Sequence, residues 1–162
     1  MQIDTSYTSP NFEGRAEGQA PSMILIHYTG MQTGREALER LCDPAAKVSA
    51  HYVIEEDGRI FALVSEDKRA WHAGVSCWEG QTDINSLSIG IELVNPGHEW
   101  GYRPFPPAQM QSLADLCKDI MARHEIKTVL GHSDVAPDRK QDPGELFDWA
   151  WLAAQGIDNI HA

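Results

Sequence analysis

The sequence lacks a long apolar run, an excess of basic residues and a cysteine framework. No stretch approaches the roughly 20 apolar residues that a membrane-spanning helix requires, so no membrane span is expected. Asp and Glu number 24 against 13 Lys and Arg, and the net charge of −11 would repel phosphate backbones. Nucleic acid is therefore not an expected partner, and the same repulsion applies to anionic membranes and polyanionic wall polymers.

Cysteine usage favours a reducing compartment. The three cysteines, Cys42, Cys77 and Cys117, are far apart and form no CxxC pair, unlike the framework of a secreted disulfide-rich protein. The first 22 residues contain no apolar run, so no signal peptide is predicted in the sequence as it stands. We expect a cytoplasmic location, with the periplasm as the alternative if a leader was removed.

The composition is that of a globular protein. With 162 residues, 42% of them hydrophobic, the chain is long enough for one domain with a sizeable core. Residues 1–22 are rich in polar residues, Gly and Pro, and are predicted to form an N-terminal surface arm. Residues 23–162 are predicted to form the single domain.

Apolar periodicity predicts a mixed α+β fold. The apolar run before His27 favours a strand buried on both faces, and two β-rich runs around Asp57-Gly58 favour a hairpin. Helices are expected behind the Thr33 cap, after Pro107, and before Gly156. The fold class is therefore α/β (mixed α+β), with a central mixed sheet of about five to six strands flanked by about three helices.

Two histidines and one aspartate are candidate metal ligands. His27 and His132 each end a predicted strand, and Asp142 follows within the stiff segment "GHSDVAPDRKQDPG". Two imidazoles and one carboxylate form a sensible zinc set that leaves a fourth position for water. The alternative is that these residues cap strand ends and satisfy backbone groups. Spacing alone leaves this alternative ahead, and no HExxH motif is present.

Further polar residues could serve chemistry or packing. Glu92 lies opposite the apolar row of its strand, beside small residues that would leave room for a ligand, and it is equally a candidate base or a surface carboxylate. An exposed solubilising role is favoured for Lys140 on sequence alone, and Trp71 with His72 could line a cleft or pack. Neither a GxSxG elbow nor an activated cysteine is present, which disfavours serine or cysteine nucleophiles.

Taken together, seven segments resemble the zinc-dependent N-acetylmuramoyl-L-alanine amidases of the type 2 amidase family, in particular its AmiD/AmpD-like branch. The segments cover nearly the whole chain in the order of the family: "SPNFEGR", "LIHYTG", "VSAHYVI", "KRAWHAGVS", "NSLSIGIELVN", "GHSDVAPDRKQDPG" and "LFDWAWLAAQGI". The resemblance implies one Zn²⁺ per chain and an amidase type 2 or peptidoglycan-recognition-protein-like fold. The residues that match the zinc ligands of the family are His27, His132 and Asp142, and those that match its catalytic pair are Glu92 and Lys140.

The resemblance also implies a reaction. It is hydrolysis of the amide between N-acetylmuramic acid, or its 1,6-anhydro form, and the L-alanine of peptidoglycan stem peptides, in muropeptide recycling or cell-wall turnover. The expected partner is a muropeptide or peptidoglycan, a monomer is expected, and substrate contacts are expected from Tyr28, Lys47 and Trp71. Alternatives are a non-catalytic peptidoglycan-binding module and a phage endolysin, although an endolysin would usually have a more basic surface.

Two positions depart from the family pattern. Relatives often carry Arg at the position of Asp83, where it can meet a stem-peptide carboxylate, so the aspartate puts that recognition of diaminopimelate in doubt. Lys47 is a candidate substitute cation, although an exposed lysine without a role is an equal alternative. Ala50 replaces a Tyr of some phage endolysins, which leaves Glu92 as the only evident base.

Overall fold

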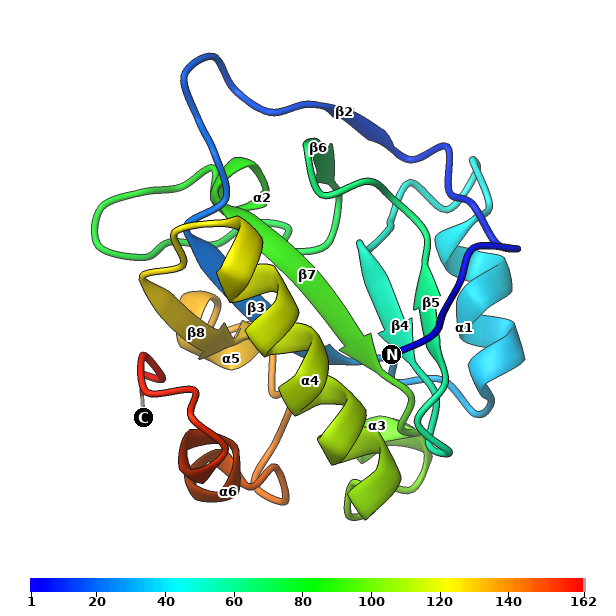
Figure 1. Cartoon of the computed structure of the whole chain (residues 1–162). Coiled ribbons are helices and arrows are strands. Elements are labelled where there is room, and N and C mark those ends of the chain that lie inside the picture. The colour runs from blue at the N-terminus through cyan, green and yellow to red at the C-terminus, as the bar shows by residue number, and fades with distance from the viewer. Residues whose placement is uncertain (162) are drawn as a thin grey trace.

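A computed structural model describes residues 1–161, and a six-stranded mixed sheet forms its centre (Figure 1). The central strand β3 pairs in parallel with β7 and with β8, and β7 pairs in parallel with β4. The hairpin of β4 and β5 is antiparallel, and β1 joins β5 in parallel at the sheet edge. In spatial order the strands are β1 (Ile3–Asp4), β5 (Ile60–Ala62), β4 (Tyr52–Ile54), β7 (Ser88–Leu93), β3 (Met23–Tyr28) and β8 (Thr128–Gly131). The mixed sheet of five to six strands is confirmed.

The parallel strands bring polar residues to one edge of the sheet. Strand β3 is buried from Met23 to His27, and His27 is the register partner of Glu92 on β7. On the other side of β3, β8 ends at Gly131, directly before His132. Because parallel strands end at the same edge, three chemically active side chains from distant parts of the chain gather there.

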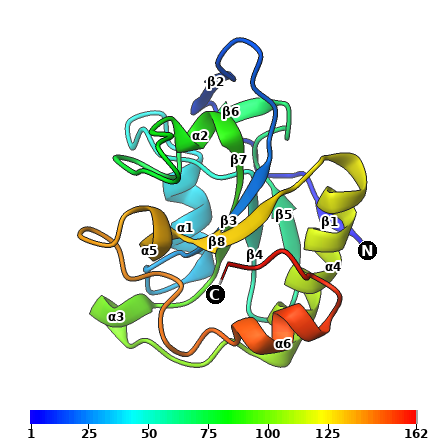
Figure 2. The same ribbon diagram turned by 90° about the vertical axis from the view of Figure 1, so that its left-hand side faces the viewer.

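Helices cover both faces of the sheet. The long helix α4 (Pro107–Arg123) packs Leu113, Leu116 and Ile120 onto one face, together with the last helix α6 (Trp149–Ala154), and α1 (Gly34–Leu41) packs on the other (Figure 2). These three helices are the ones expected from the sequence. Three one-turn helices were not predicted: α2 (Ile84–Leu87), α3 (Gly97–Trp100) and α5 (His132–Val135).

The local signals in the sequence act as expected. The Thr33 hydroxyl accepts a hydrogen bond from the backbone N–H of Glu36 at 3.1 Å and so caps α1. Pro107 occupies the first turn of α4. Gly58 turns the β4–β5 hairpin with φ 95°, and a Cβ there would stand 3.0 Å from the carbonyl oxygen of Ala108.

The N-terminal segment takes part in two sheets. Besides β1, it forms β2 (Phe12–Gly14), which pairs antiparallel with β6 (Lys68–Ala70) in a two-stranded sheet. The Arg15 guanidinium donates to the carbonyl oxygens of Glu66 and Ser88 and so ties this segment to the main sheet. Over the described part of the chain, no helix is both long enough and apolar enough to cross a bilayer.

Candidate metal centre and active site

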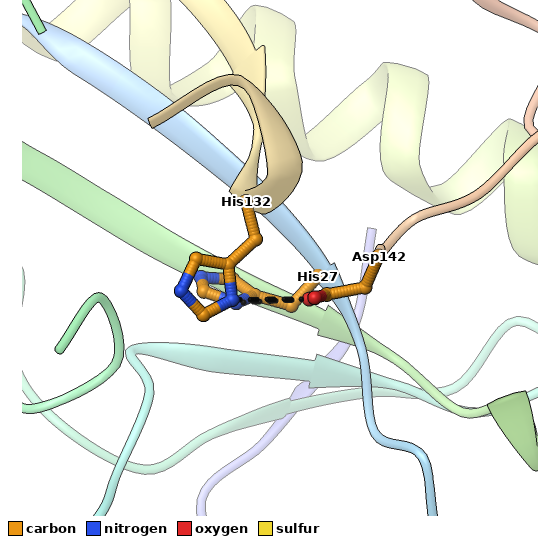
Figure 3. Close-up of side chains that lie close together, drawn as sticks. All are labelled: His27, His132 and Asp142. Atoms are coloured by element: carbon orange, nitrogen blue, oxygen red, sulfur yellow. Dashed lines mark hydrogen bonds and ion pairs between the residues drawn. The ribbon is translucent and has the colours of Figure 1, made fainter. Parts of the chain in front are cut away.

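His27, His132 and Asp142 form a compact buried cluster at the edge of the sheet (Figure 3). The Nδ1 atoms of the two histidines are 3.0 Å apart. The Asp142 Oδ2 atom is 3.3 Å from Nδ1 of His27 and 3.2 Å from Nδ1 of His132. One strand end, one helix start and one loop thus present three donor atoms to a single point.

The loop that carries Asp142 is fixed to the start of α5. The backbone N–H of Ser133 donates to the carbonyl oxygen of Asp142 at 3.0 Å. A Cβ on Gly131 would stand 2.7 Å from Cδ of Pro143, so the absence of a side chain allows the loop to approach. The proline-rich segment therefore places Asp142 beside the end of β8, where His132 follows.

The outer nitrogen of each histidine contacts a hydrogen-bonding partner. His132 Nε2 is 2.8 Å from the carbonyl oxygen of Ala73, which can only accept, so Nε2 carries the proton and Nδ1 has a free lone pair. His27 Nε2 is 2.9 Å from Nδ1 of His72. The inward direction of both Nδ1 atoms follows from these outer contacts.

The charges of the cluster are those that a metal requires. Burial, and then the neighbouring His132, lower the pKa of His27 to about 4, so its imidazole is neutral at pH 7. Burial alone would raise the pKa of Asp142, but the neighbouring imidazoles of His132 and His27 outweigh it and hold this pKa well below its usual range. A neutral imidazole and an ionised carboxylate are the protonation states that bind a divalent ion.

The spacing of the donors also fits zinc. Tetrahedral coordination with bonds of about 2.0–2.1 Å places the ligand atoms about 3.3 Å apart. The three observed separations lie between 3.0 and 3.3 Å. Because three protein ligands leave a fourth position free, the set resembles a catalytic site more closely than a closed structural one.

Glu92 faces this cluster from the neighbouring strand. Its Oε1 atom is 3.9 Å from Nδ1 of His27, and its side chain is 13% exposed. Its Oε2 atom is buried and has no hydrogen-bond partner in residues 1–161. Burial, reinforced by the charge of Asp142, raises the pKa of this carboxyl well above its ordinary value, whereas Lys140 lowers it. A raised pKa beside a metal site is typical of a general acid or base.

The space expected beside Glu92 on its own strand is occupied. The His72 ring lies against Gly90, where a Cβ would stand only 2.5 Å from Cγ of that ring. The interpretation that small residues leave room for a ligand there is therefore wrong. Because Gly90 has no side chain, the buried ring of His72 occupies the space beside it. The open volume lies instead at the strand end.

A cleft of about 640 Å³ opens over the cluster. Of the other sequence candidates, Tyr28, Trp71 and Lys140 line it together with the cluster and Glu92. Lys47 does not line it, although its neighbour Val48 does, and Asp83 instead caps α2 and pairs with Arg69. Arg40, His98 and Glu99 also line the cleft, and no pattern in the sequence indicates them.

Comparison with known proteins shows the family to which the chain is similar. The family model described as N-acetylmuramoyl-L-alanine amidase matches residues 17–145. The N-acetylmuramoyl-L-alanine amidase AmiD of Escherichia coli (strain K12) is 45% identical over 149 residues, which cover 83% of this chain and 53% of AmiD. The chain thus spans about half the length of that relative. The 1,6-anhydro-N-acetylmuramyl-L-alanine amidase AmpD of the same organism is 37% identical over 88% of this chain and 86% of AmpD.

A solved structure extends the likeness to three dimensions. It is the complex of E. coli AmiD with the substrate anhydro-N-acetylmuramic acid-L-Ala-D-gamma-Glu-L-Lys. It matches with a TM-score of 0.78 and 43% identity, covering 88% of this chain and 61% of that one. With a family model over most of its length and relatives of this similarity, the chain belongs to the N-acetylmuramoyl-L-alanine amidase family.

Proposed function

We propose that this protein is a zinc-dependent N-acetylmuramoyl-L-alanine amidase. It hydrolyses the amide between N-acetylmuramic acid, or its 1,6-anhydro form, and the L-alanine of a stem peptide. The observation that carries the proposal is the buried triad of His27, His132 and Asp142, with its donor atoms within 4.8 Å, at the base of a cleft that Glu92 also lines. The named activities of AmiD and AmpD, and the muropeptide bound to AmiD, support this substrate class.

The triad would hold one Zn²⁺ per chain. When bound there, zinc supplies Lewis acidity, which polarises a substrate carbonyl and acidifies a water molecule. Glu92 takes the proton from the attacking water and passes it to the nitrogen of the leaving L-alanine, as the C–N bond breaks. Its burial keeps the carboxylate basic enough for the first transfer, and the side chain lines the cleft.

Lys140 stabilises the charge that develops on the carbonyl oxygen. The side chain lines the cleft and lies close enough to Glu92 to lower the pKa of its carboxyl. An ammonium group close to a developing oxyanion stabilises the transition state more than the ground state. Lys140 thereby assists bond breaking without transferring a proton.

The walls of the cleft bind the sugar and peptide. Tyr28, at the end of β3, and Trp71, directly after β6, line the cleft with aromatic surface. Lys47, beside Val48, is proposed to contact a stem-peptide carboxylate at the outer rim.

We infer a role in recycling soluble muropeptides in the cytoplasm, with wall turnover in the periplasm as the second candidate. The inference is supported by the absence of disulfides among residues 1–161, where Cys42, Cys77 and Cys117 are all free, and by the similarity to AmpD over 86% of its length. A monomeric state stays a prediction that light scattering on the purified protein can check.

Metal analysis and turnover test the proposal together. Zinc is quantified in the purified protein, and release of stem peptide from anhydro-muropeptide and from intact sacculi is followed by chromatography, with and without a chelator. We expect one zinc per chain and chelator-sensitive cleavage. Cleavage of the soluble fragment alone supports recycling, and cleavage of sacculi supports wall turnover. Stoichiometric zinc without cleavage of either substrate would indicate a peptidoglycan-binding module, and absence of zinc would overturn the metal site.

A further inference from the structure

A line of hydrogen bonds leads from His27 to the backbone of α2. His27 Nε2 is 2.9 Å from Nδ1 of His72, and Nε2 of His72 is 3.1 Å from the Ser88 hydroxyl oxygen. That hydroxyl donates to the carbonyl oxygen of Ile84 at 2.7 Å. His27, His72 and Ser88 are all buried, which strengthens the hydrogen bonds along this line.

The carbonyl at the far end determines the direction of every bond. A carbonyl oxygen only accepts, so the single hydroxyl proton of Ser88 goes to Ile84 and its oxygen accepts from Nε2–H of His72. Nδ1 of a neutral His72 is then bare and accepts from Nε2–H of His27. Nδ1 of His27 is left with a free lone pair, which points at His132 and Asp142.

We propose that His72 and Ser88 are positioning residues that hold His27 in the tautomer and orientation required to ligate the metal. The inference rests on the proposed zinc site, and it goes beyond it by assigning residues that never touch the metal. A hydrogen-bond partner on the outer nitrogen of a ligating histidine sets ring orientation and raises ligand basicity. Here that partner is a second buried histidine, itself oriented by a serine on the strand that carries Glu92.

The surroundings of His72 fix its ring in place. Its backbone N–H donates to Oδ1 of Asn85 at 3.1 Å, and its ring covers Gly90 so closely that a Cβ there would stand 2.5 Å from Cγ. The carbonyl oxygen of the next residue, Ala73, accepts a hydrogen bond from Nε2–H of His132. Residues 72 and 73 therefore orient both imidazoles of the triad, one through a side chain and the other through the backbone.

The direction of the bonds can be tested without metal. Long-range proton–nitrogen correlation NMR of the zinc-free protein distinguishes the two tautomers of each histidine. We expect Nε2–H on both His27 and His72. A proton on Nδ1 of His72 would overturn the inference, because His72 would then be unable to accept from His27.

A second test measures zinc affinity by competition with a chelator. Ser88→Ala removes the acceptor for His72 and should weaken zinc binding by about tenfold or more, within the range found for outer partners of metal ligands. Ser9→Ala is the matched control, because the Ser9 hydroxyl is also buried, donates to the carbonyl oxygen of Leu41 and accepts from the N–H of Asn11. Both variants should lower the Tm of the zinc-free protein, but only Ser88→Ala should weaken zinc binding.

Two substitutions of nearly equal shape separate positioning from packing. His72→Asn retains an acceptor near the position of Nδ1, whereas His72→Leu fills a similar volume without one. We expect the leucine variant to bind zinc at least tenfold more weakly than the asparagine variant, and cobalt-substituted protein to show a changed absorption spectrum for leucine alone. Equal zinc affinities for Ser88→Ala, Ser9→Ala and wild type would overturn the inference, whereas a wild type that binds no zinc would overturn the proposed function itself.

Discussion

Two carboxylates in this molecule, Glu92 and Glu66, are equally removed from solvent but differ in their hydrogen-bond partners. Both side chains are 13% exposed. Glu66 accepts hydrogen bonds from the Tyr52 hydroxyl, from Arg123 at 2.6 Å and 3.1 Å, and from His124 at 2.8 Å. Glu92 has one oxygen with no partner in the described residues and a second 3.9 Å from His27.

The difference in partners produces opposite acidities. Burial alone would raise the pKa of Glu66, but its hydrogen bonds with Arg123, Tyr52 and His124 hold it at about 2. Burial without such bonds raises the pKa of Glu92. A fully satisfied carboxylate holds segments of the chain together, whereas an unsatisfied one is free to exchange a proton with a ligand.

The largest effect on zinc binding and activity is expected at Asp142, the ionised carboxylate beside Glu92. Asp142→Ala removes one of three metal donors and should abolish both zinc binding and amidase activity. Zinc content by atomic emission and stem-peptide release by chromatography measure the two losses. Full zinc content and activity in this variant would show that Asp142 is not a metal ligand.

Glu92→Gln should separate catalysis from metal binding. The amide keeps the shape but cannot take a proton, so kcat should fall by about 10²–10⁴-fold, as for loss of general acid–base catalysis. Zinc content should stay at one per chain, and the Tm should not fall, because no hydrogen bond to the unpartnered oxygen is lost. A kcat close to that of wild type would show that Glu92 is not the base.

Lys140→Met tests the group that lowers the pKa of Glu92. The substitution retains a long flexible side chain and removes its charge, so kcat should fall by about 10²–10³-fold, the usual effect of losing one oxyanion contact. KM should change less, because the contact strengthens only in the transition state. Steady-state kinetics separate the two constants, and a change confined to KM would make Lys140 a substrate-binding residue.

The places of His27, His132 and Glu92 in the fold could be predicted from the sequence, because strand ends are visible in it. Continuous apolar runs place His27 and His132 at strand ends, and alternation places Glu92 on the face opposite the apolar row; parallel pairing then makes them neighbours. Asp142 is harder to predict, because its position depends on how a loop returns to Gly131. The resemblance to a family supplied what spacing alone left undecided.

The rest of the site depends on pairs of residues that no local pattern connects. The ring of His72 fills the space over Gly90 and contacts Ser88, which lie 18 and 16 positions further along the chain, so these residues meet only after folding. The cleft wall at His98 is likewise held by Tyr28 and Glu145, far away in the sequence. Strand β1 has two residues, too few for alternation to be detected.

The smallest expected effect is on stability, at the satisfied carboxylate. Glu66→Gln should lower the free energy of unfolding at pH 7 by about 1–3 kcal/mol, since the ion pair with Arg123 is lost and the amide cannot accept every bond. Amidase activity below the melting transition should be unchanged. Urea denaturation and steady-state kinetics measure the two quantities.

The same variant should change the pH dependence of stability. Because the pKa of Glu66 is lowered by folding, to about 2, its ionised form stabilises the protein above its ordinary pKa of 4.5, and this contribution is lost as the pH falls from there toward 2. Burial lowers the pKa of His51 to about 4, which destabilises the protein in acid, but this effect is common to both proteins. The difference in unfolding free energy between wild type and Glu66→Gln should therefore shrink between pH 4.5 and pH 2. If this difference in unfolding free energy stays constant over the range, the charge of Glu66 does not stabilise the fold. The contrast between Glu66 and Glu92 would then no longer rest on charge.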